Sequence, residues 1–176
     1  VDADGNAVAM TTTIEDSFGS RLMTEGGFLL NNELTDFSFA PMENGKPVAN
    51  RVEPGKRPRS AMSPTIVYDR AGNIYMIAGS PGRSAIINYV GKTLIAVLDW
   101  GLDPQAAIAL PNFGSRNGPT ELEAGTSAAA LEPMLRALGH ETRVMEQTSG
   151  TQAIVRTKSG WIGGADPRRE GSVRGD

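Results

Sequence analysis

Apolar side chains in the middle of the chain recur with the period of a helix. The pattern extends from Ser84 to Trp100 and predicts a helix with one apolar face. Its apolar positions are Ile86, Ile87, Val90, Leu94, Val97 and Leu98. Gly101 follows, where a residue in the left-handed conformation commonly ends a helix. Asp103 and Pro104 then supply a side-chain cap and a proline at the first helical position, which predicts a second helix through Leu110.

Runs of strand-forming residues flank this helical region. Before it, Thr65–Tyr68 and Asn73–Ala78 are rich in β-branched and aromatic residues and are separated by a short turn-like link, which predicts a hairpin. After it, Ala153–Thr157 and Trp161–Gly164 predict a second hairpin for the same reason. Ala7–Ile14, which follows a turn, predicts one more strand. Antiparallel sheet is therefore expected to dominate.

The remaining segments complete the expected architecture. Pro133 begins a short helical run that reaches Leu138 and ends at Gly139. Residues 37–60 have no periodicity and contain several prolines and glycines, which indicates a long loop of the kind that is usually functional or disordered. Strands, then helices, then strands again predict an α+β layered domain, which we expect to extend over residues 1–176.

Composition and charge exclude several classes of function. A formal net charge of −3 gives no basic face for nucleic acid. The local clusters at Arg51–Arg59 and Arg168–Arg169 are interpreted as solvated surface or as anchors for a partner segment. The chain has no cysteine and one histidine, His140, expected on the surface just after a helix end. A disulfide framework, a thiolate metal site and a multi-histidine metal centre are excluded, and no cofactor is implied.

The sequence predicts no membrane-spanning segment. No apolar run approaches the ~20 residues that a membrane-spanning helix needs. The sequence opens on the polar segment Val1–Asn6, with neither methionine nor a signal peptide. We interpret this start as that of a processed or truncated chain.

Three short segments have the residue types of functional sites. Gly79–Gly82 joins a predicted strand to the long helix, where backbone N–H groups at the positive end of a helix dipole suit an anion or a developing oxyanion. Glu33 and Asp36 lie between apolar flanks and can jointly receive an ammonium group. Arg57–Pro64 offers serine hydroxyls for a carboxylate. Each segment also fits a structural role, as a steric glycine turn, a capping cluster or a strand-entry turn.

Together, these segments resemble the small subunit of the γ-glutamyltransferase family over essentially the whole chain. The matching segments are Thr11–Ile14, Phe18–Gly19, Leu29–Asn32, Asp36–Ser38, Ser60–Pro64, Gly79–Gly82 and Ala165–Arg168. The resemblance implies an N-terminal-nucleophile hydrolase with an αββα sandwich fold. It also implies a large subunit, cut from the same precursor by the precursor itself, which completes the fold.

The resemblance assigns catalytic roles by position. The nucleophile of the family is the N-terminal threonine of the small chain, with its own α-amine as the base. Thr13 would hydrogen-bond and tune that threonine, and the backbone N–H groups of Gly82 and Arg83 would form the oxyanion hole. Glu33 and Asp36 would hold the α-ammonium group of the substrate.

Further positions depart from the family pattern. The family's small chain begins Thr-Thr-His a few residues before the position of Val1, so the nucleophile is absent from the sequence given and this chain alone is expected to be inactive. Ser60 would help to bind the substrate α-carboxylate, but Ala61 replaces a second serine. Glu15 stands at a substrate-contacting position that is commonly asparagine. Arg83 replaces a glycine, which would either strain a left-handed backbone or place a side chain in the site that offsets the charge of Glu15. We therefore expect recognition of the glutamyl group to be modified.

The resemblance implies cleavage of γ-glutamyl amide bonds through a threonyl ester, with transfer to water or to an amine acceptor. Glutathione or another γ-glutamyl compound would be the substrate, and the protein would be periplasmic or secreted. The irregular segment 39–56 would correspond to a lid in some members. Two alternatives stay open: an acylase for cephalosporin-type or polyglutamate substrates on the same scaffold, and a non-catalytic binding homologue.

Overall fold

The computed structural model describes residues 1–175, which form two compact units. Unit 1 contains Val1–Thr11 and the chain from Ala61 onward, and unit 2 contains Thr12–Ser60. Each unit has its own hydrogen-bonded elements, and each is described separately below.

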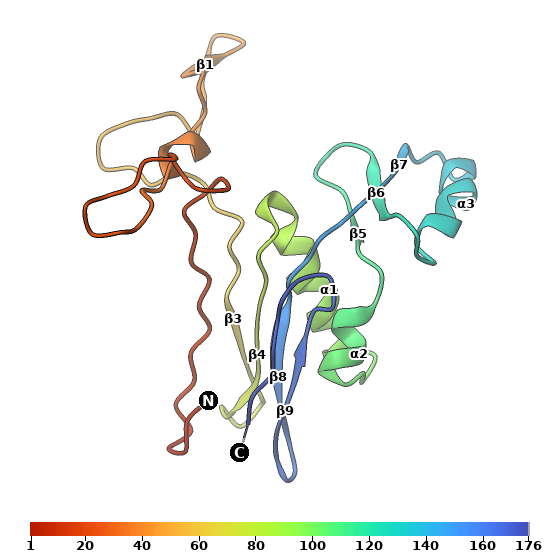
Figure 1. Cartoon of the computed structure of the whole chain (residues 1–176). Helices are drawn as coiled ribbons and strands as arrows, with labels where there is room; N and C mark the ends of the chain where they lie inside the picture. Colours follow the sequence, from red (N-terminus) through yellow and green to blue (C-terminus); the bar gives the residue numbers. More distant parts are fainter. Residues whose placement is uncertain (176) are drawn as a thin grey trace. The chain divides into compact units, whose positions relative to one another are not determined.

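Unit 1 is built on a four-stranded antiparallel sheet in the order β3-β4-β8-β9 (Figure 1). The strands are β3 (Thr65–Tyr68), β4 (Ile74–Gly79), β8 (Gln152–Thr157) and β9 (Gly160–Ala165). Both predicted hairpins are confirmed, as β3 pairs with β4 and β8 with β9. The two hairpins join through β4 and β8, with Ala78 opposite Ala153. Sequence periodicity alone does not reveal this long-range pairing.

Two helices cover one face of this sheet. They are α1 (Ile86–Leu98) and α2 (Pro104–Ala109), and the first turn before α1 is a 3₁₀ helix, η2 (Arg83–Ala85). The Asp103 carboxylate caps α2 as expected, because it accepts a hydrogen bond of 3.0 Å from the N–H of Ala106.

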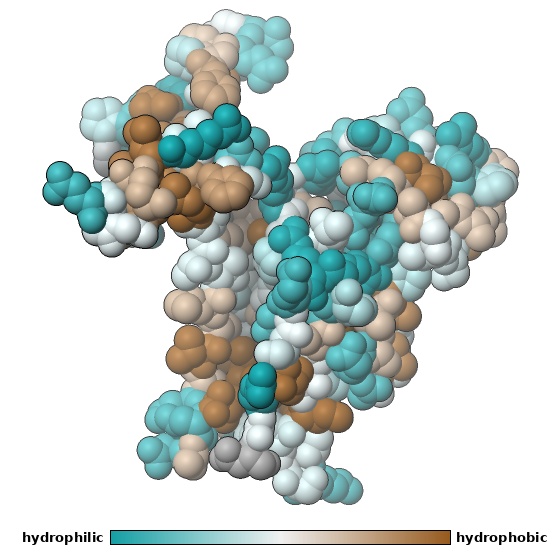
Figure 2. Space-filling model, viewed as in Figure 1, coloured by the Kyte–Doolittle hydropathy of each residue, from teal (hydrophilic) through white to brown (hydrophobic). Residues whose placement is uncertain are grey.

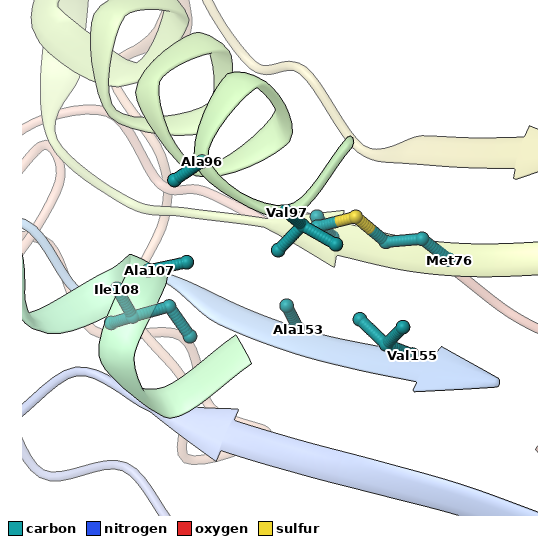
Figure 3. Close-up of a cluster of buried hydrophobic side chains, with 8 residues drawn as sticks. Met76, Ala96, Val97, Ala107, Ile108, Ala153 and Val155 are labelled. Atoms are coloured by element: carbon teal, nitrogen blue, oxygen red, sulfur yellow. The ribbon is translucent and has the colours of Figure 1, made fainter. Parts of the chain in front are cut away.

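The core of unit 1 lies between these helices and the sheet (Figure 3). β4 and β8 supply the sheet side of this core, and α1 and α2 supply the other side. The buried residues are Met76, Ala78, Ala96, Val97, Ala107, Ile108, Ala153 and Val155. Many of them are small, so the helices approach the sheet closely. At Gly164 in β9, an added Cβ would lie 2.7 Å from the backbone nitrogen of Gln105, so α2 rests directly on this strand.

A second sheet in unit 1 was not predicted. It contains β5 (Phe113–Gly114), β6 (Thr120–Glu123) and β7 (Thr142–Met145), and β6 and β7 run parallel. The connection between them carries α3 (Glu132–Ala137), which ends before the exposed His140 as expected. These strands are short and partly polar, so they have no clear alternation of apolar residues.

The predicted strand at Ala7–Ile14 is wrong. This segment has no strand assignment, and residues 7–11 pair with no other strand in the part of the chain that the structure describes. Val8 and Met10 are about three-quarters exposed, at 76% and 75%. Residues of high strand propensity form a strand only when another strand satisfies their backbone groups.

Unit 2 consists of turns, isolated bridges and short elements. The expected long loop contains a small hairpin of β1 (Met42–Glu43) and β2 (Lys46–Pro47). Its turn residues Asn44 and Gly45 have φ of 49° and 74°, which suits a tight hairpin turn. Phe37 is buried, but many other apolar side chains of unit 2 are exposed, and apolar surface is visible on this unit in Figure 2. Among residues 1–175, no helix has the length and apolar character needed to cross a membrane.

Candidate active site

Unit 2 brings three carboxylates together. The short 3₁₀ helix η1 (Glu33–Asp36) begins and ends with an acidic residue, and at three residues per turn these two lie on one side. Asn32 attaches the segment of Glu15 to this helix. Its N–H donates to the carbonyl of Ile14 at 3.2 Å, and its Oδ1 accepts from the N–H of Asp16 at 3.0 Å. Residues far apart in the sequence thus form one cluster.

The acidic cluster, Glu15, Glu33 and Asp36, has the charge and spacing of a cation site. One carboxylate oxygen from each residue lies within 4.8 Å of those of the other two, and all three side chains are half-buried. Burial raises the pKa of Glu33, and the neighbouring charges of Asp36 and Glu15 raise it further. A bound cation would relieve this repulsion, so the cluster suits an ammonium group or a metal ion.

Thr13 supports the backbone that carries Glu15. Its hydroxyl oxygen accepts a hydrogen bond of 2.8 Å from the N–H of Glu15. Glu15 itself has φ of 70°, a left-handed conformation that costs a residue with a side chain about 1–2 kcal/mol. Such strain is often found at functional sites, where the surrounding structure holds it in place. Ser60 is the last residue of unit 2 and is exposed, and the half-buried Ala61 is the first residue of the main segment of unit 1.

In unit 1, residues Gly79–Arg83 connect β4 to η2 and α1. We call this segment the oxyanion loop, after the role expected of it. Gly82 has φ of 141°, and an added Cβ would lie only 2.5 Å from Cε2 of the Tyr89 ring. Only glycine fits this combination of backbone conformation and close approach. Arg83 has φ of 55°, so the left-handed backbone expected to be strained is present. The helical residues begin here, which places the positive end of the helix dipole at Gly82 and Arg83.

A set of buried polar residues supports the oxyanion loop, a role that the sequence analysis assigned to none of them. The Ser80 hydroxyl donates to the carbonyl of Pro81 at 2.7 Å and accepts from the N–H of Gly150 at 3.3 Å. Ser149 and Asp166, which adjoin this contact, are almost completely buried. The Asp-Pro-Arg sequence that directly follows β9 was the signal that could have identified part of this set.

Of the two interpretations given for the cluster that contains Arg168, solvated surface is wrong for this residue. Its side chain is only 15% exposed and forms ion pairs with Glu123 and Asp166. It also donates to the carbonyl of Leu110 at 3.1 Å. Burial lowers the pKa of a guanidinium, but hydrogen bonds from Arg168 to the two carboxylates outweigh that effect and leave its pKa raised. Arg168 instead anchors the segment after β9 to α2 and β6.

The residues expected at the site therefore form two local groups. Glu15, Glu33 and Asp36 gather in unit 2 beside Thr13, and Gly82 and Arg83 form the oxyanion loop of unit 1. The first group has the chemistry of cation binding, and the second has that of anion stabilisation.

Comparisons with known proteins agree over the whole chain. The family model described as gamma-glutamyltranspeptidase matches residues 1–175. The glutathione hydrolase proenzyme of Escherichia coli (strain K12) is 41% identical over 179 residues, which cover 96% of this chain and 30% of that relative. A solved gamma-glutamyltranspeptidase from Pseudomonas nitroreducens, complexed with L-DON, has a TM-score of 0.86 at 33% identity and covers 100% of this chain and 96% of its own. A cephalosporin acylase from Bacillus halodurans is less similar, with a TM-score of 0.77 at 25% identity over 92% of this chain.

These similarities confirm the predicted α+β fold and its likeness to solved N-terminal-nucleophile hydrolases of this group. The chain spans about a third of the length of the first curated relatives, at 30% and 32%. The family model covers nearly every residue, and the similarity to the Escherichia coli relative extends over 96% of the chain. The chain therefore belongs to the gamma-glutamyltranspeptidase family.

Proposed function

We propose that this chain is the small subunit of an enzyme that cleaves γ-glutamyl amide bonds, with glutathione or a related compound as acyl donor. The acidic cluster carries the proposal, because three carboxylates within 4.8 Å of one another attract a cation, and a glutamyl substrate brings one in its α-ammonium group. Glu33 and Asp36 hold that ammonium, and Glu15 adds a third negative charge. The acylase alternative has less support, because the cephalosporin acylase is the more distant relative.

The oxyanion loop supplies the second half of the proposed reaction. The hydroxyl of the threonine at the precursor cleavage point adds to the γ-carbonyl carbon, and its proton passes to the α-amine of the same residue. The N–H groups of Gly82 and Arg83 stabilise the negative charge that develops on the carbonyl oxygen. The amine leaves with a proton, and water or an acceptor amine then cleaves the threonyl ester. Thr13 tunes the attacking hydroxyl.

The α-carboxylate of the substrate has fewer hydroxyl donors in this chain than the family resemblance leads one to expect. Ser60 offers one, and Ala61 offers none. The loss of a hydrogen bond to a charged group costs about 1.5–3 kcal/mol. We infer that the loss of the hydroxyl at Ala61 weakens binding of the α-carboxylate. The contacts to the α-ammonium group then contribute a larger share of the binding energy of the substrate.

The rest of the precursor is the proposed partner. This chain covers 96% of a separate chain in the Pseudomonas nitroreducens structure, but only 30% of the Escherichia coli proenzyme. The exposed apolar side chains of unit 2 offer surface for such a partner to cover. The resemblance also implies a periplasmic or secreted protein, which cell fractionation would test.

The direct test uses the complete precursor after maturation. Release of p-nitroaniline from γ-glutamyl-p-nitroanilide is measured for wild type, for Glu33→Gln and for the control Glu25→Gln, which changes an exposed glutamate of the same unit. We expect Glu33→Gln to raise KM about 10- to 100-fold, as the loss of a charged hydrogen bond predicts, with the control unchanged. Turnover of a cephalosporin-type acyl substrate without γ-glutamyl turnover would contradict the proposal.

A further inference from the structure

A buried lysine anchors a chain of hydrogen bonds in unit 1. Lys92 lies on α1 and is 7% exposed. Its Nζ donates to the carbonyls of Ile108 at 3.1 Å and Leu110 at 2.7 Å, and to Oδ1 of Asn112 at 2.9 Å. The two carbonyls belong to the end of α2, where carbonyl groups have no partner within the helix. All three donor positions of the ammonium are therefore occupied.

The chain of hydrogen bonds continues from Asn112 to a buried carboxylate. Nδ2 of Asn112 donates to the Ser149 hydroxyl at 2.8 Å, and that hydroxyl donates to Oδ2 of Asp166. An ammonium only donates and an ionised carboxylate only accepts, so both ends fix the direction of every bond. The orientations of the Asn112 amide and the Ser149 hydroxyl follow from this. We call Lys92, Asn112, Ser149 and Asp166 the relay.

The relay holds the backbone on both sides of Gly150. Oδ2 of Asp166 accepts from the Ser149 hydroxyl and also from the N–H of Thr151 at 3.2 Å. The N–H of Asp166 donates in turn to the carbonyl of Thr151 at 2.9 Å. Gly150 is thus fixed between two residues that the same carboxylate binds.

Gly150 in turn presses against the oxyanion loop. An added Cβ at Gly150 would lie 2.7 Å from Cγ of Pro81, and its N–H donates to the Ser80 hydroxyl at 3.3 Å. At the next residue of the loop, an added Cβ on Gly82 would lie 2.5 Å from the Tyr89 ring. Gly150 and Tyr89 therefore hold two successive residues of the loop, and a shift of the relay would be transmitted to it directly.

We propose that the relay is a positioning device that sets the direction of the oxyanion-hole N–H groups at Gly82 and Arg83. The inference rests on the proposed function of that loop. It adds residues that do not touch the substrate and that act through Gly150. Hydrogen-bond donors to an oxyanion act on the transition state, so a displaced loop lowers kcat more than it changes KM.

The charges that face Lys92 make this relay sensitive to pH. Three other charged groups act on Lys92: the cation Arg168 and the anions Asp166 and Glu123. Burial, with the repulsion of Arg168, lowers the pKa of Lys92 to about 8, although both carboxylates favour the ammonium. The ammonium that fixes the direction of the relay is thus present below this pKa and is lost as pH rises through it.

The test compares Lys92→Gln with Lys158→Gln in the complete two-chain enzyme. Lys158 is an exposed lysine in the turn between β8 and β9, so its variant is a matched loss of charge. For Lys92→Gln we expect kcat to fall about tenfold, with KM for a γ-glutamyl anilide within about twofold. We also expect the wild-type fall in kcat above about pH 8 to be absent from the variant. A change in KM as large as the change in kcat would overturn the proposal. So would a variant whose kcat still falls above about pH 8 as in wild type.

Hydrogen exchange separates this inference from the proposed function. In Ser149→Ala, which interrupts the relay without removing a charge, amides of residues 79–85 should exchange about tenfold faster than in wild type. Amides of β8, Gln152–Thr157, should keep their rates if the fold is intact. If wild type turns over no γ-glutamyl substrate, the function fails and the exchange result still stands. Equal exchange in residues 79–85 would refute the relay whatever the activity.

Discussion

Substitution of Glu15 by glutamine isolates the third charge of the acidic cluster. The variant keeps the size of the side chain and removes one of three negative charges whose oxygens lie within 4.8 Å. For an ammonium bound at about the same distance from the Glu15 carboxylate, the attraction is about 0.9 kcal/mol in water and about 3.5 kcal/mol at an effective dielectric constant of about 20. Because the group is half-exposed, solvent screening favours the lower value. A cost of about 1 kcal/mol corresponds to about a fivefold rise in KM for a substrate with an α-ammonium.

The same variant changes the pH dependence in a defined direction. Burial, Asp36 and Glu15 all raise the pKa of Glu33, so at mildly acidic pH this carboxylate is protonated more than an ordinary glutamate. Protonation removes its attraction for an ammonium, and KM therefore falls as pH rises through the pKa of Glu33. In Glu15→Gln one cause of the raised pKa is lost, so the fall in KM moves to lower pH.

The assay measures KM of the complete enzyme for γ-glutamyl-p-nitroanilide from mildly acidic to neutral pH. The variants are Glu15→Gln, Glu33→Gln, the double variant and the exposed control Glu25→Gln. The double variant tests whether the two charges act on the same cation, because independent sites give additive effects and a shared cation does not. A KM that is unchanged or lower in Glu15→Gln, with no shift of the pH profile, would refute the electrostatic reasoning.

Three further outcomes follow from local geometry. The free energy of unfolding of Arg83→Gly should be about 1–2 kcal/mol higher than that of Arg83→Ala, because both lose the arginine side chain and only glycine tolerates φ of 55° without strain. Equal denaturation midpoints would show that the strain is absent. Asp103→Ala should lose about 1 kcal/mol of stability by removing the cap of α2, whereas a loss no larger than that of the exposed Asp99→Ala would count against the cap. Thr151→Val should not lower the unfolding midpoint, because its buried hydroxyl has no partner within residues 1–175; a lower midpoint would place a partner in the complete enzyme.

The parts of the fold that the sequence predicted correctly are those with local signals. The helix α1 has a regular apolar stripe, α2 has Asp103 and Pro104 at its start, and the hairpins have runs of strand-forming residues joined by short turns. The parallel pair β6 and β7 has no such signal, since the two strands lie on either side of α3 and their pairing depends on contacts distant in sequence. Segment 7–14 is the opposite case: its residues have high strand propensity, but within residues 1–175 it has no partner strand and forms no strand.

The candidate site and its surroundings also contain residues that local sequence indicates and others that depend on contacts distant in sequence. Glu33, Asp36 and Gly82 lie in short segments whose residue types already indicate binding, so sequence reasoning could name them as candidates. Lys92 was overlooked because it interrupts an apolar pattern, although it stands three residues after the buried Tyr89 and four before the buried Ala96. A lysine on the buried face of a helix needs acceptors, and that requirement was the available signal. Its acceptors come from α2 and beyond, which no local pattern specifies.

Burial and charge balance distinguish what the two groups of ionisable residues do. Lys92 and Arg168 oppose Asp166 and Glu123 in the interior of unit 1, and such a buried set is tolerated because it is balanced and hydrogen-bonded. It needs nothing from solution, so it is suited to hold a loop in place. The acidic cluster is half-exposed, and repulsion within it raises the pKa of Glu33, so a cation from solution stabilises it. The two groups should therefore affect different kinetic constants: the balanced set should act on kcat, and the acidic cluster on KM.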